Sequence, residues 1–321
     1  MKPKVAFYWC SSCGGCEEAI IDLNEDILKV VEAVDIVFWP VAMDTKYADV
    51  ERLADGELAV AFINGAVRMD EQEEIAKLLR RKAQVVIAVG SCAHMGGIPG
   101  LANFFDRESI LRRAYQEVPS LADAQPVTPS ETTRTEHGTL TLPRFWERVK
   151  RLGDVIDVDY FLPGCPPMPD TIRDALAALL SGKLPPKGSV LSPSKNLCHG
   201  CPRLPNKPET LAIDRIRRIH EVEVGPDECF LAKGVICIGP ATRSGCGERC
   251  LHANMPCRGC YGPSDDKSDQ GGALLSSLAS MIDMKDADKI DSLFKSFADI
   301  PGTVYRFSLP ASLVQKGNLL P

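Results

Sequence analysis

Glu57-Leu58-Ala59-Val60-Ala61-Phe62-Ile63-Asn64 and Gln84-Val85-Val86-Ile87-Ala88-Val89-Gly90 are two nearly continuous apolar runs. Strands covered on both faces, as in a parallel sheet, have this pattern because neither face meets water. Residues 4–9, 35–42 and 155–162 are similar short runs rich in Val, Ile, Phe and Ala. The five runs together predict a parallel β-sheet.

Segments with helical periodicity lie between and after these runs. Residues 17–34 place Ile20, Leu23 and Ile27 on one face, and residues 69–83 do the same with Ile75 and Leu79. A third helix is expected over residues 169–180. Strands that alternate with helices are typical of a doubly wound α/β sheet, in which the loops after the strands meet at one edge. The fold class is therefore α/β.

The chain is long enough for two domains, with 321 residues of which 45% are hydrophobic and 25% charged. Residues 182–188, rich in Gly, Pro and Lys, are typical of a linker. We therefore expect a flavodoxin-like domain over residues 1–184 and a smaller, mostly irregular or helical domain over residues 185–321. Secondary features are a surface hairpin within 119–142 and helices near 144–152, 274–284 and 287–297.

Charge and hydropathy exclude several classes of partner. The net charge is −6 and the pI is about 5.5, which gives no electrostatic reason to expect nucleic acid or an anionic membrane. No apolar run approaches the roughly 20 residues of a membrane-spanning helix. Residues 1–9 run directly into a strand pattern without a secretory or twin-arginine signal. We expect a cytoplasmic protein.

Cysteine is the residue type that carries the chemistry. In a reducing compartment, the 13 cysteines favour metal ligation or redox work over disulfides. Four thiolates complete each iron–sulfur cluster or zinc site, so the dense C-terminal tract predicts two sites. That tract comprises Cys198, Cys201, Cys229, Cys237, Cys246, Cys250, Cys257 and Cys260. The remaining five, Cys10, Cys13, Cys16, Cys92 and Cys165, lie near predicted strand ends and indicate a third site at the sheet edge.

Three motifs carry a resemblance to a known family. They are Cys13-Gly14-Gly15-Cys16-Glu17-Glu18, Gly90-Ser91-Cys92-Ala93-His94-Met95-Gly96-Gly97-Ile98-Pro99 and Leu162-Pro163-Gly164-Cys165-Pro166-Pro167. Together and in this order they resemble the small, electron-transferring subunit of [NiFe] hydrogenases. The resemblance implies that the proximal [4Fe–4S] cluster is held by Cys13, Cys16, Cys92 and Cys165. Cys10 falls outside the motif and is interpreted as a packed thiol.

The resemblance also assigns the C-terminal tract. It implies a distal [4Fe–4S] cluster on Cys198, Cys201, Cys229 and Cys237, and a medial [4Fe–4S] cluster on Cys246, Cys250, Cys257 and Cys260. Cys198 stands where membrane-linked relatives have histidine, and Cys250 adds a fourth thiolate to a three-iron site. Because thiolate in place of histidine lowers the potential of a cluster, we expect a low-potential relay.

Three residues beside these motifs have simpler interpretations. His199 and His252 are expected to be solvated or hydrogen-bonded rather than ligands, since the thiolate sets are complete. Glu17 is interpreted as an acidic residue at a helix start, where the helix dipole favours it.

Among cytoplasmic classes, the pattern looks most like the small subunit of F420-non-reducing (methyl-viologen-reducing) hydrogenases. The resemblance implies a large [NiFe] subunit, a small iron–sulfur adaptor and a heterodisulfide reductase-like complex as partners. Electrons from H2 would pass from the large subunit through three [4Fe–4S] clusters to the adaptor and a flavin or heterodisulfide reductase-type acceptor. No residue of this chain needs to act as acid, base or nucleophile, and no FMN is expected.

Other functions remain open on the sequence alone. The chain could serve another cytoplasmic [NiFe] hydrogenase class, F420-linked or NAD(P)-linked. It could also be an FMN-binding flavodoxin-like protein with a zinc-stabilised tail, although the loop at Cys13 to Cys16 lacks the Ser and Thr of a phosphate-binding turn. The single-cluster subunit of respiratory complex I would leave the C-terminal cysteines without a role.

Overall fold

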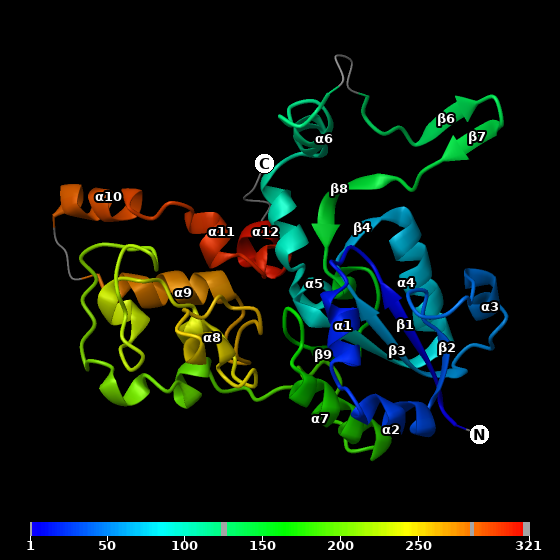
Figure 1. Ribbon diagram of the computed structural model, residues 1–321, viewed down its shortest axis with the longest axis horizontal. Helices are drawn as coiled ribbons and strands as arrows, with labels where there is room; N and C mark the ends of the chain where they lie inside the picture. The colour runs from blue at the N-terminus through cyan, green and yellow to red at the C-terminus, as the bar shows by residue number, and fades with distance from the viewer. Residues whose placement is uncertain (1, 123–126, 283–285, 317–321) are drawn as a thin grey trace.

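A computed structural model describes residues 2–122, 127–282 and 286–316. The chain forms two bodies that lie side by side, an N-terminal one built on a central sheet and a C-terminal one of short helices and loops (Figure 1). The sheet has five parallel strands in the order β2-β1-β3-β5-β9. Renumbered along the sheet, this is the 2-1-3-4-5 order of flavodoxin-like folds. The predicted fold class is confirmed.

The two apolar runs form the centre of the sheet. Ala61 and Ile63 in β3, and Val86, Ile87 and Ala88 in β5, are all 0% exposed. The strands are β1 (Lys4–Trp9), β2 (Asp35–Phe38), β3 (Leu58–Asn64), β5 (Ala83–Val89) and β9 (Tyr160–Leu162). The outer strands β2 and β9 are shorter than the predicted 35–42 and 155–162.

Helices cover both faces of the sheet. On one face α4 (Asp70–Lys82) buries Ile75, Leu78 and Leu79, as its periodicity predicts. On the other, α1 (Gly15–Ile21) and α7 (Pro169–Leu180) bury Ile20 and Ile172. The remaining helices of this body are α2 (Asp26–Ala33), α3 (Tyr47–Glu51), α5 (Gly90–Met95), α6 (Arg107–Tyr115) and the 3₁₀ helices η1 (Ile98–Phe104) and η2 (Leu152–Asp154).

Two local predictions are wrong. The single helix expected over 17–34 is broken between α1 and α2, where Asn24 has a left-handed backbone (φ 53°) that asparagine tolerates better than most residues. The helix expected near 144–152 is instead the strand β8 (Phe145–Lys150), which pairs with β4 (Val67–Met69). Arg68 stacks on Phe145 (4.3 Å to the ring centroid) and donates to the carbonyl of Trp146, so tertiary contacts override the helical pattern.

The predicted surface hairpin is present. Strands β6 (Thr132–Thr135) and β7 (Gly138–Thr141) pair with each other and with no other described strand, and every residue in them is exposed (Figure 1). Part of the segment, residues 123–126, lies outside the described residues.

The carboxylate of Asp159 ties three elements together and is only 7% exposed. It accepts from Arg80 Nη1 (2.6 Å), Lys187 Nζ (2.5 Å) and the N–H of Val86 (2.8 Å). Burial by itself would raise the pKa of Asp159, but the hydrogen bonds from Lys187, Arg80 and Val86 outweigh it and lower the pKa. The charged carboxylate therefore stabilises the folded state.

Replacing Asp159 with asparagine is expected to destabilise the chain by roughly 1–3 kcal/mol at pH 7, the range for hydrogen bonds to charged groups. Because the folded-state pKa is lowered, this stabilisation is complete above the ordinary Asp pKa of about 3.9 and is lost as the pH falls through the folded value. Urea-unfolding midpoints at pH 7 and at about pH 3 should show the difference between the two proteins shrinking. Asp157→Asn, at an exposed neighbour, is the control; an equal loss there would contradict the assignment.

The C-terminal body has its own apolar core, centred on residues such as Phe230, Leu251 and Leu274. Its helices are η3 (Leu197–Gly200), η4 (Leu204–Asn206), η5 (Phe230–Lys233), η6 (Gly239–Ala241), α8 (Arg249–His252), α9 (Gln270–Ala279), α10 (Ala287–Lys295), α11 (Ile300–Val304), η7 (Leu309–Ala311) and α12 (Leu313–Lys316). Helix α9 overlaps the predicted 274–284 but begins at Gln270 and ends at Ala279, and α10 begins at Ala287 as predicted but ends at Lys295 rather than at residue 297. Residues 283–284 lie outside the described residues. The boundary between residues 184 and 185 stays a prediction.

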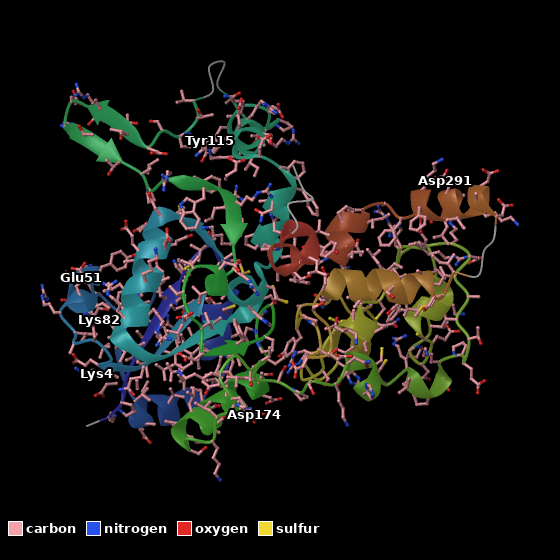
Figure 2. The ribbon with its side chains drawn as sticks, turned by 180° about the vertical axis from the view of Figure 1, so that it is seen from behind. Lys4, Glu51, Lys82, Tyr115, Asp174 and Asp291 are labelled. Atoms are coloured by element: carbon pink, nitrogen blue, oxygen red, sulfur yellow. The ribbon has the colours of Figure 1, made fainter. Side chains whose placement is uncertain are left out.

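The last segment returns to the first body. The N–H of Gly97 donates to the carbonyl of Phe307 (3.1 Å), and Pro310 packs so closely on Gly96 and Gly100 that a Cβ at either glycine would collide with its ring. The charged side chains labelled in Figure 2, such as Lys4 and Asp291, lie at the periphery of the two bodies. None of the helices in the described ranges combines the length and apolarity required to cross a membrane.

Candidate functional site

The loops that leave three sheet strands bring four cysteines together. Cys13 and Cys16 follow β1, Cys92 lies in α5 directly after β5, and Cys165 follows β9. Burial raises the pKa of the Cys16 thiol, and Cys92, Cys165 and Cys13 raise it further through their negative charge. Cys165 and Cys13 act on Cys92 in the same way. The four predicted proximal residues are therefore neighbours at one sheet edge.

Two glycines with left-handed backbones make room for the sulfur atoms. A Cβ on Gly90 (φ 81°) would collide with Cys16 Sγ, and one on Gly97 (φ 58°) with Cys92 Sγ and with the Cys92 Cα at 2.8 Å. Only glycine combines this backbone conformation with so close an approach. The space around these two sulfurs is thus set by the backbone.

The site opens toward the surface on one side. Cys16 and Cys92 are buried, whereas Cys13 and Cys165 are exposed. Trp9, at the end of β1, is 43% exposed, and Ile98, just beyond Gly97, is 44% exposed. A Cβ on Gly14 would lie 3.6 Å from Trp9 Cζ3, so the Trp9 ring is beside the loop that carries Cys13.

Cys10 lies apart from this group. Its pKa is raised to about 12 by burial, with no contribution from another cysteine. Its backbone N–H donates to the carbonyl of Asn64 (2.8 Å), which fixes it at the end of β1. These surroundings agree with the interpretation of Cys10 as a packed thiol.

Cys198, Cys201, Cys229 and Cys237 form a second group. All four line one small cavity. The pKa of Cys198 is raised to about 12 by burial, then by Cys237, Cys201 and Cys229. A Cβ on Gly239 would lie 3.4 Å from Cys198 Sγ and 3.5 Å from Cys237 Sγ.

Cys246, Cys250, Cys257 and Cys260 form a third group, placed between the other two. The pKa of Cys260 is raised to about 12 by burial, then by Cys246, and also by Cys165 and Cys250. Burial, then Cys237, then Cys260 raise the pKa of Cys257. The backbone N–H of Cys257 donates to Cys237 Sγ (3.3 Å). The three groups thus follow one another, with Cys165 beside Cys260 and Cys257 beside Cys237.

Hydrogen bonds join the N-terminal and C-terminal bodies where Cys165 lies beside Cys260. The hydroxyl of Ser91 donates to the carbonyl of Cys260 (2.5 Å). The hydroxyl of Tyr261 accepts from the N–H of Met168 (3.1 Å) and pairs with Thr171 Oγ1 (3.0 Å). These bonds hold the loop that follows Cys165 and the segment at Cys260 against each other.

Sequence reasoning missed one polar cluster beside the first group. Glu17 lies in the first turn of α1, as expected, but is only 4% exposed. It accepts hydrogen bonds from Trp39 Nε1 and from Asn64 Nδ2, the latter at 2.7 Å. Asn64, a polar residue closing the apolar run of β3, was the available signal. The cluster anchors the helix that carries Cys16.

The remaining candidates lie outside the cysteine groups. His199 Nδ1 is hydrogen-bonded to Asn196 Oδ1 (2.8 Å), which agrees with its interpretation as a hydrogen-bonding residue. His252 is exposed at the end of α8. Within the described ranges, no group of three or more His, Cys, Asp or Glu side chains is placed so that it could hold a single metal ion.

Comparison with known proteins gives matches over most of the chain. Residues 13–179 match the family described as NADH ubiquinone oxidoreductase, 20 Kd subunit. The iron-sulfur subunit of the F420-non-reducing hydrogenase of Archaeoglobus profundus is 37% identical over 319 residues, 98% of this chain and 99% of the relative. The corresponding F420-non-reducing hydrogenase subunit of Methanothermobacter thermautotrophicus is 41% identical over 316 residues, 98% of this chain and 96% of the relative.

A solved structure supports the fold. The [NiFeSe] hydrogenase from Desulfovibrio vulgaris Hildenborough superimposes with a TM-score of 0.51 at 20% sequence identity, over 83% of this chain and 95% of that one. The resemblance predicted from the cysteine motifs is confirmed by the matches to the two archaeal relatives, which run along nearly the whole length of both chains. The chain belongs to the family of small, iron–sulfur subunits of F420-non-reducing hydrogenases.

Proposed function

We propose that this chain is the electron-transfer subunit of a cytoplasmic [NiFe] hydrogenase. It carries electrons from H2 oxidation at the NiFe centre of a large subunit, through three [4Fe–4S] clusters, to an iron–sulfur adaptor and a flavin or heterodisulfide reductase-type acceptor. One observation carries the proposal: twelve cysteines form three groups of four that follow one another through the molecule.

The residues fit the proposed clusters. Cys13, Cys16, Cys92 and Cys165 would hold the proximal cluster, Cys246, Cys250, Cys257 and Cys260 the medial one, and Cys198, Cys201, Cys229 and Cys237 the distal one. Burial raises the pKa of most of these thiols, so in the absence of iron they stay protonated. Iron binding stabilises the thiolate and offsets this cost. Once bound, the clusters supply one-electron redox chemistry.

The surroundings of the first group support docking of a large subunit there. Cys13 and Cys165 are exposed, and the half-exposed Trp9 lies beside Gly14, the residue after Cys13. Aromatic side chains such as that of Trp9 are enriched at buried interface cores. The large subunit would cover them and exclude water from the first step of the relay.

The group of Cys198, Cys201, Cys229 and Cys237 ends the relay on the opposite side. The first three of these cysteines are partly exposed, so an acceptor can approach them. Arg203 supports the loops around them: it is 2% exposed, stacks on Phe230 (4.2 Å) and donates to the carbonyl of Glu228 (2.6 Å). We place the iron–sulfur adaptor at this end.

Metal and sulfide analysis of the anaerobically purified complex tests the proposal. We expect about 12 iron and 12 acid-labile sulfide per chain, from three clusters of four irons and four sulfides. Mass spectrometry of the co-purified subunits should find a nickel-containing large subunit. Zinc without sulfide would instead indicate the flavodoxin-like protein with a zinc-stabilised tail. A large subunit with an F420-linked or NAD(P)-linked partner would indicate another hydrogenase class.

A further inference from the structure

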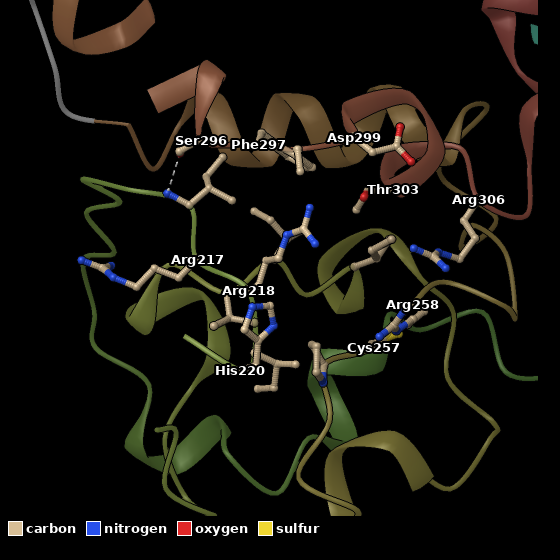
Figure 3. Close-up of a pocket in the computed structure, with 17 residues that line it drawn as sticks. Arg217, Arg218, His220, Cys257, Arg258, Ser296, Phe297, Asp299, Thr303 and Arg306 are labelled. Carbon is tan, nitrogen blue, oxygen red and sulfur yellow. Dashed lines mark hydrogen bonds between the residues drawn. The ribbon is translucent and has the colours of Figure 1, made fainter. Parts of the chain in front are cut away.

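A cavity of about 420 Å³ lies in the C-terminal body, beside Cys257 (Figure 3). The segment around Arg218, the segment around Arg258, and the region of α10 and α11 form its walls. Its volume is within the range of small-molecule sites, which run from about 300 to 1,000 Å³. Nothing in the proposed relay uses this space.

Three arginine side chains face the cavity, and its lining holds a single carboxylate. Figure 3 shows the side chains of Arg218, Arg258 and Arg306 turned toward it. Among the described residues, none of the three guanidinium groups has a hydrogen-bond acceptor or an ion-pair partner. That carboxylate, Asp299, accepts a hydrogen bond from the N–H of Gly302 (2.9 Å) at the start of α11, and its single negative charge opposes three guanidinium groups. The cavity therefore has excess positive charge.

Arg306 is the innermost of these cations. It is half-buried, and its Nε is buried with no hydrogen-bond partner among the described residues, while Arg218 and Arg258 are exposed. Burial lowers the pKa of Arg306, and the like charge of Arg258 lowers it further, while the negative charge of Asp299 only partly offsets these two effects. A guanidinium held near another cation and short of an acceptor is stabilised by any anion that enters.

The neighbouring Arg217 shows that this arrangement is not general to the segment. Arg217 is also among the residues that line the cavity, but its side chain points away from it in Figure 3. Its Nη1 donates to Asp214 Oδ1 (3.3 Å) and to the carbonyl of Lys233 (3.3 Å). Of these two adjacent residues, Arg217 thus has hydrogen-bond partners, whereas Arg218 faces the cavity.

We propose that this cavity binds a small phosphate-bearing anion. Guanidinium groups match phosphate oxygens with paired hydrogen bonds, and the side chains of His220 and Thr303 in the lining add further polar groups. Ile236 and Phe297 supply apolar wall for an organic part of the ligand. Because positive charge extends from the exposed Arg218 and Arg258 to the half-buried Arg306, the cavity favours a small molecule over a protein surface. Since Cys257 also lines the cavity, the ligand would bring its negative charge beside one proposed medial ligand.

Calorimetric titration of the anaerobic holo-complex with inorganic phosphate and with ADP, at constant ionic strength, tests the proposal. We expect saturable binding to the unmodified protein. Arg306→Gln and Arg258→Gln should each weaken it about tenfold or more, as for loss of a charge-assisted pair. Arg306→Lys, which keeps the charge, should weaken it less. Arg217→Gln is the matched control and should change it less than about twofold.

The two probes distinguish the source of the phosphate. Tighter binding of ADP indicates an organic phosphate that uses the apolar wall, and equal binding indicates free phosphate; both support the proposal. No saturable binding of either probe, equal weakening by Arg217→Gln, or tighter binding of an acidic peptide than of both probes would overturn it. Iron analysis of the same complex separates this inference from the proposed function. Saturable anion binding by a natively purified complex that holds no iron would contradict the proposed relay and leave this inference standing, whereas about 12 iron per chain without anion binding would overturn this inference alone.

Discussion

Replacing Cys16 with alanine is expected to abolish hydrogen-dependent reduction of a viologen dye by the complex. Cys16 is buried in the group at the sheet edge, and the three other cysteines of that group all act on its pKa. Without its thiolate, one iron of the proposed proximal cluster would lose its protein ligand at the first step of the proposed relay. We expect a rate at least about a hundredfold lower, at the upper end of the effect of altering a metal's surroundings. The proximal EPR signal should be lost or altered, and the other two retained.

Cys10→Ala is the matched control. Cys10 and Cys16 are both buried cysteines, 5% and 7% exposed, but only Cys16 has cysteine neighbours that shift its pKa. Cys10→Ala should therefore keep the dye-reduction rate and all EPR signals, with at most a small loss of stability. Loss of activity in both variants, or in Cys10→Ala alone, would mean that the ligand set is assigned wrongly.

Replacing Gly97 with alanine is expected to prevent assembly of the proposed proximal cluster while every cysteine is retained. The added Cβ would collide with Cys92 Sγ and lie 2.8 Å from Cys92 Cα, and the φ of 58° already strains a side chain. Either Cys92 or the loop after α5 must move, which displaces one of the four sulfurs. Iron analysis should give about 8 iron per chain instead of about 12, with a matching loss of dye reduction.

Gly56→Ala separates the collision from the backbone strain. Gly56 also has a positive φ, 74°, but no atom lies within 4 Å of the position that an added methyl group would occupy. Its substitution should cost about 1 kcal/mol of stability from the left-handed backbone and leave the iron content unchanged. If Gly56→Ala lost iron to the same extent, general destabilisation would explain both results.

The sequence predicted the centre of the sheet and the cysteine loops because both depend on local pattern. Residues 57–64 and 84–90 are apolar on both faces, and only a covered parallel strand suits such a run. Cys92 and Cys165 come directly after predicted strands, and strand ends of a parallel sheet share one edge. These features needed no knowledge of distant contacts.

The missed features depend on contacts between distant residues. Phe145 and Trp146 form a strand because β4 and Arg68 pair with them, which a helical pattern in 144–152 does not show. The ring of Pro310 leaves no room for a side chain at Gly96 or Gly100, yet Pro310 is far from both glycines in the sequence. The arginine cavity is likewise assembled from separate segments.

The hydrogen bonds from Ser91 to Cys260 and from Met168 to Tyr261 make the proposed relay depend on how the two bodies dock. They join the two bodies at the point where the proposed relay passes from Cys165 to Cys260. In a chain whose halves have each folded but not yet docked, the proposed proximal cluster would lie in one body and the proposed medial and distal clusters in the other. Electron transfer from the proposed proximal cluster to the proposed medial one would therefore require the two bodies to dock.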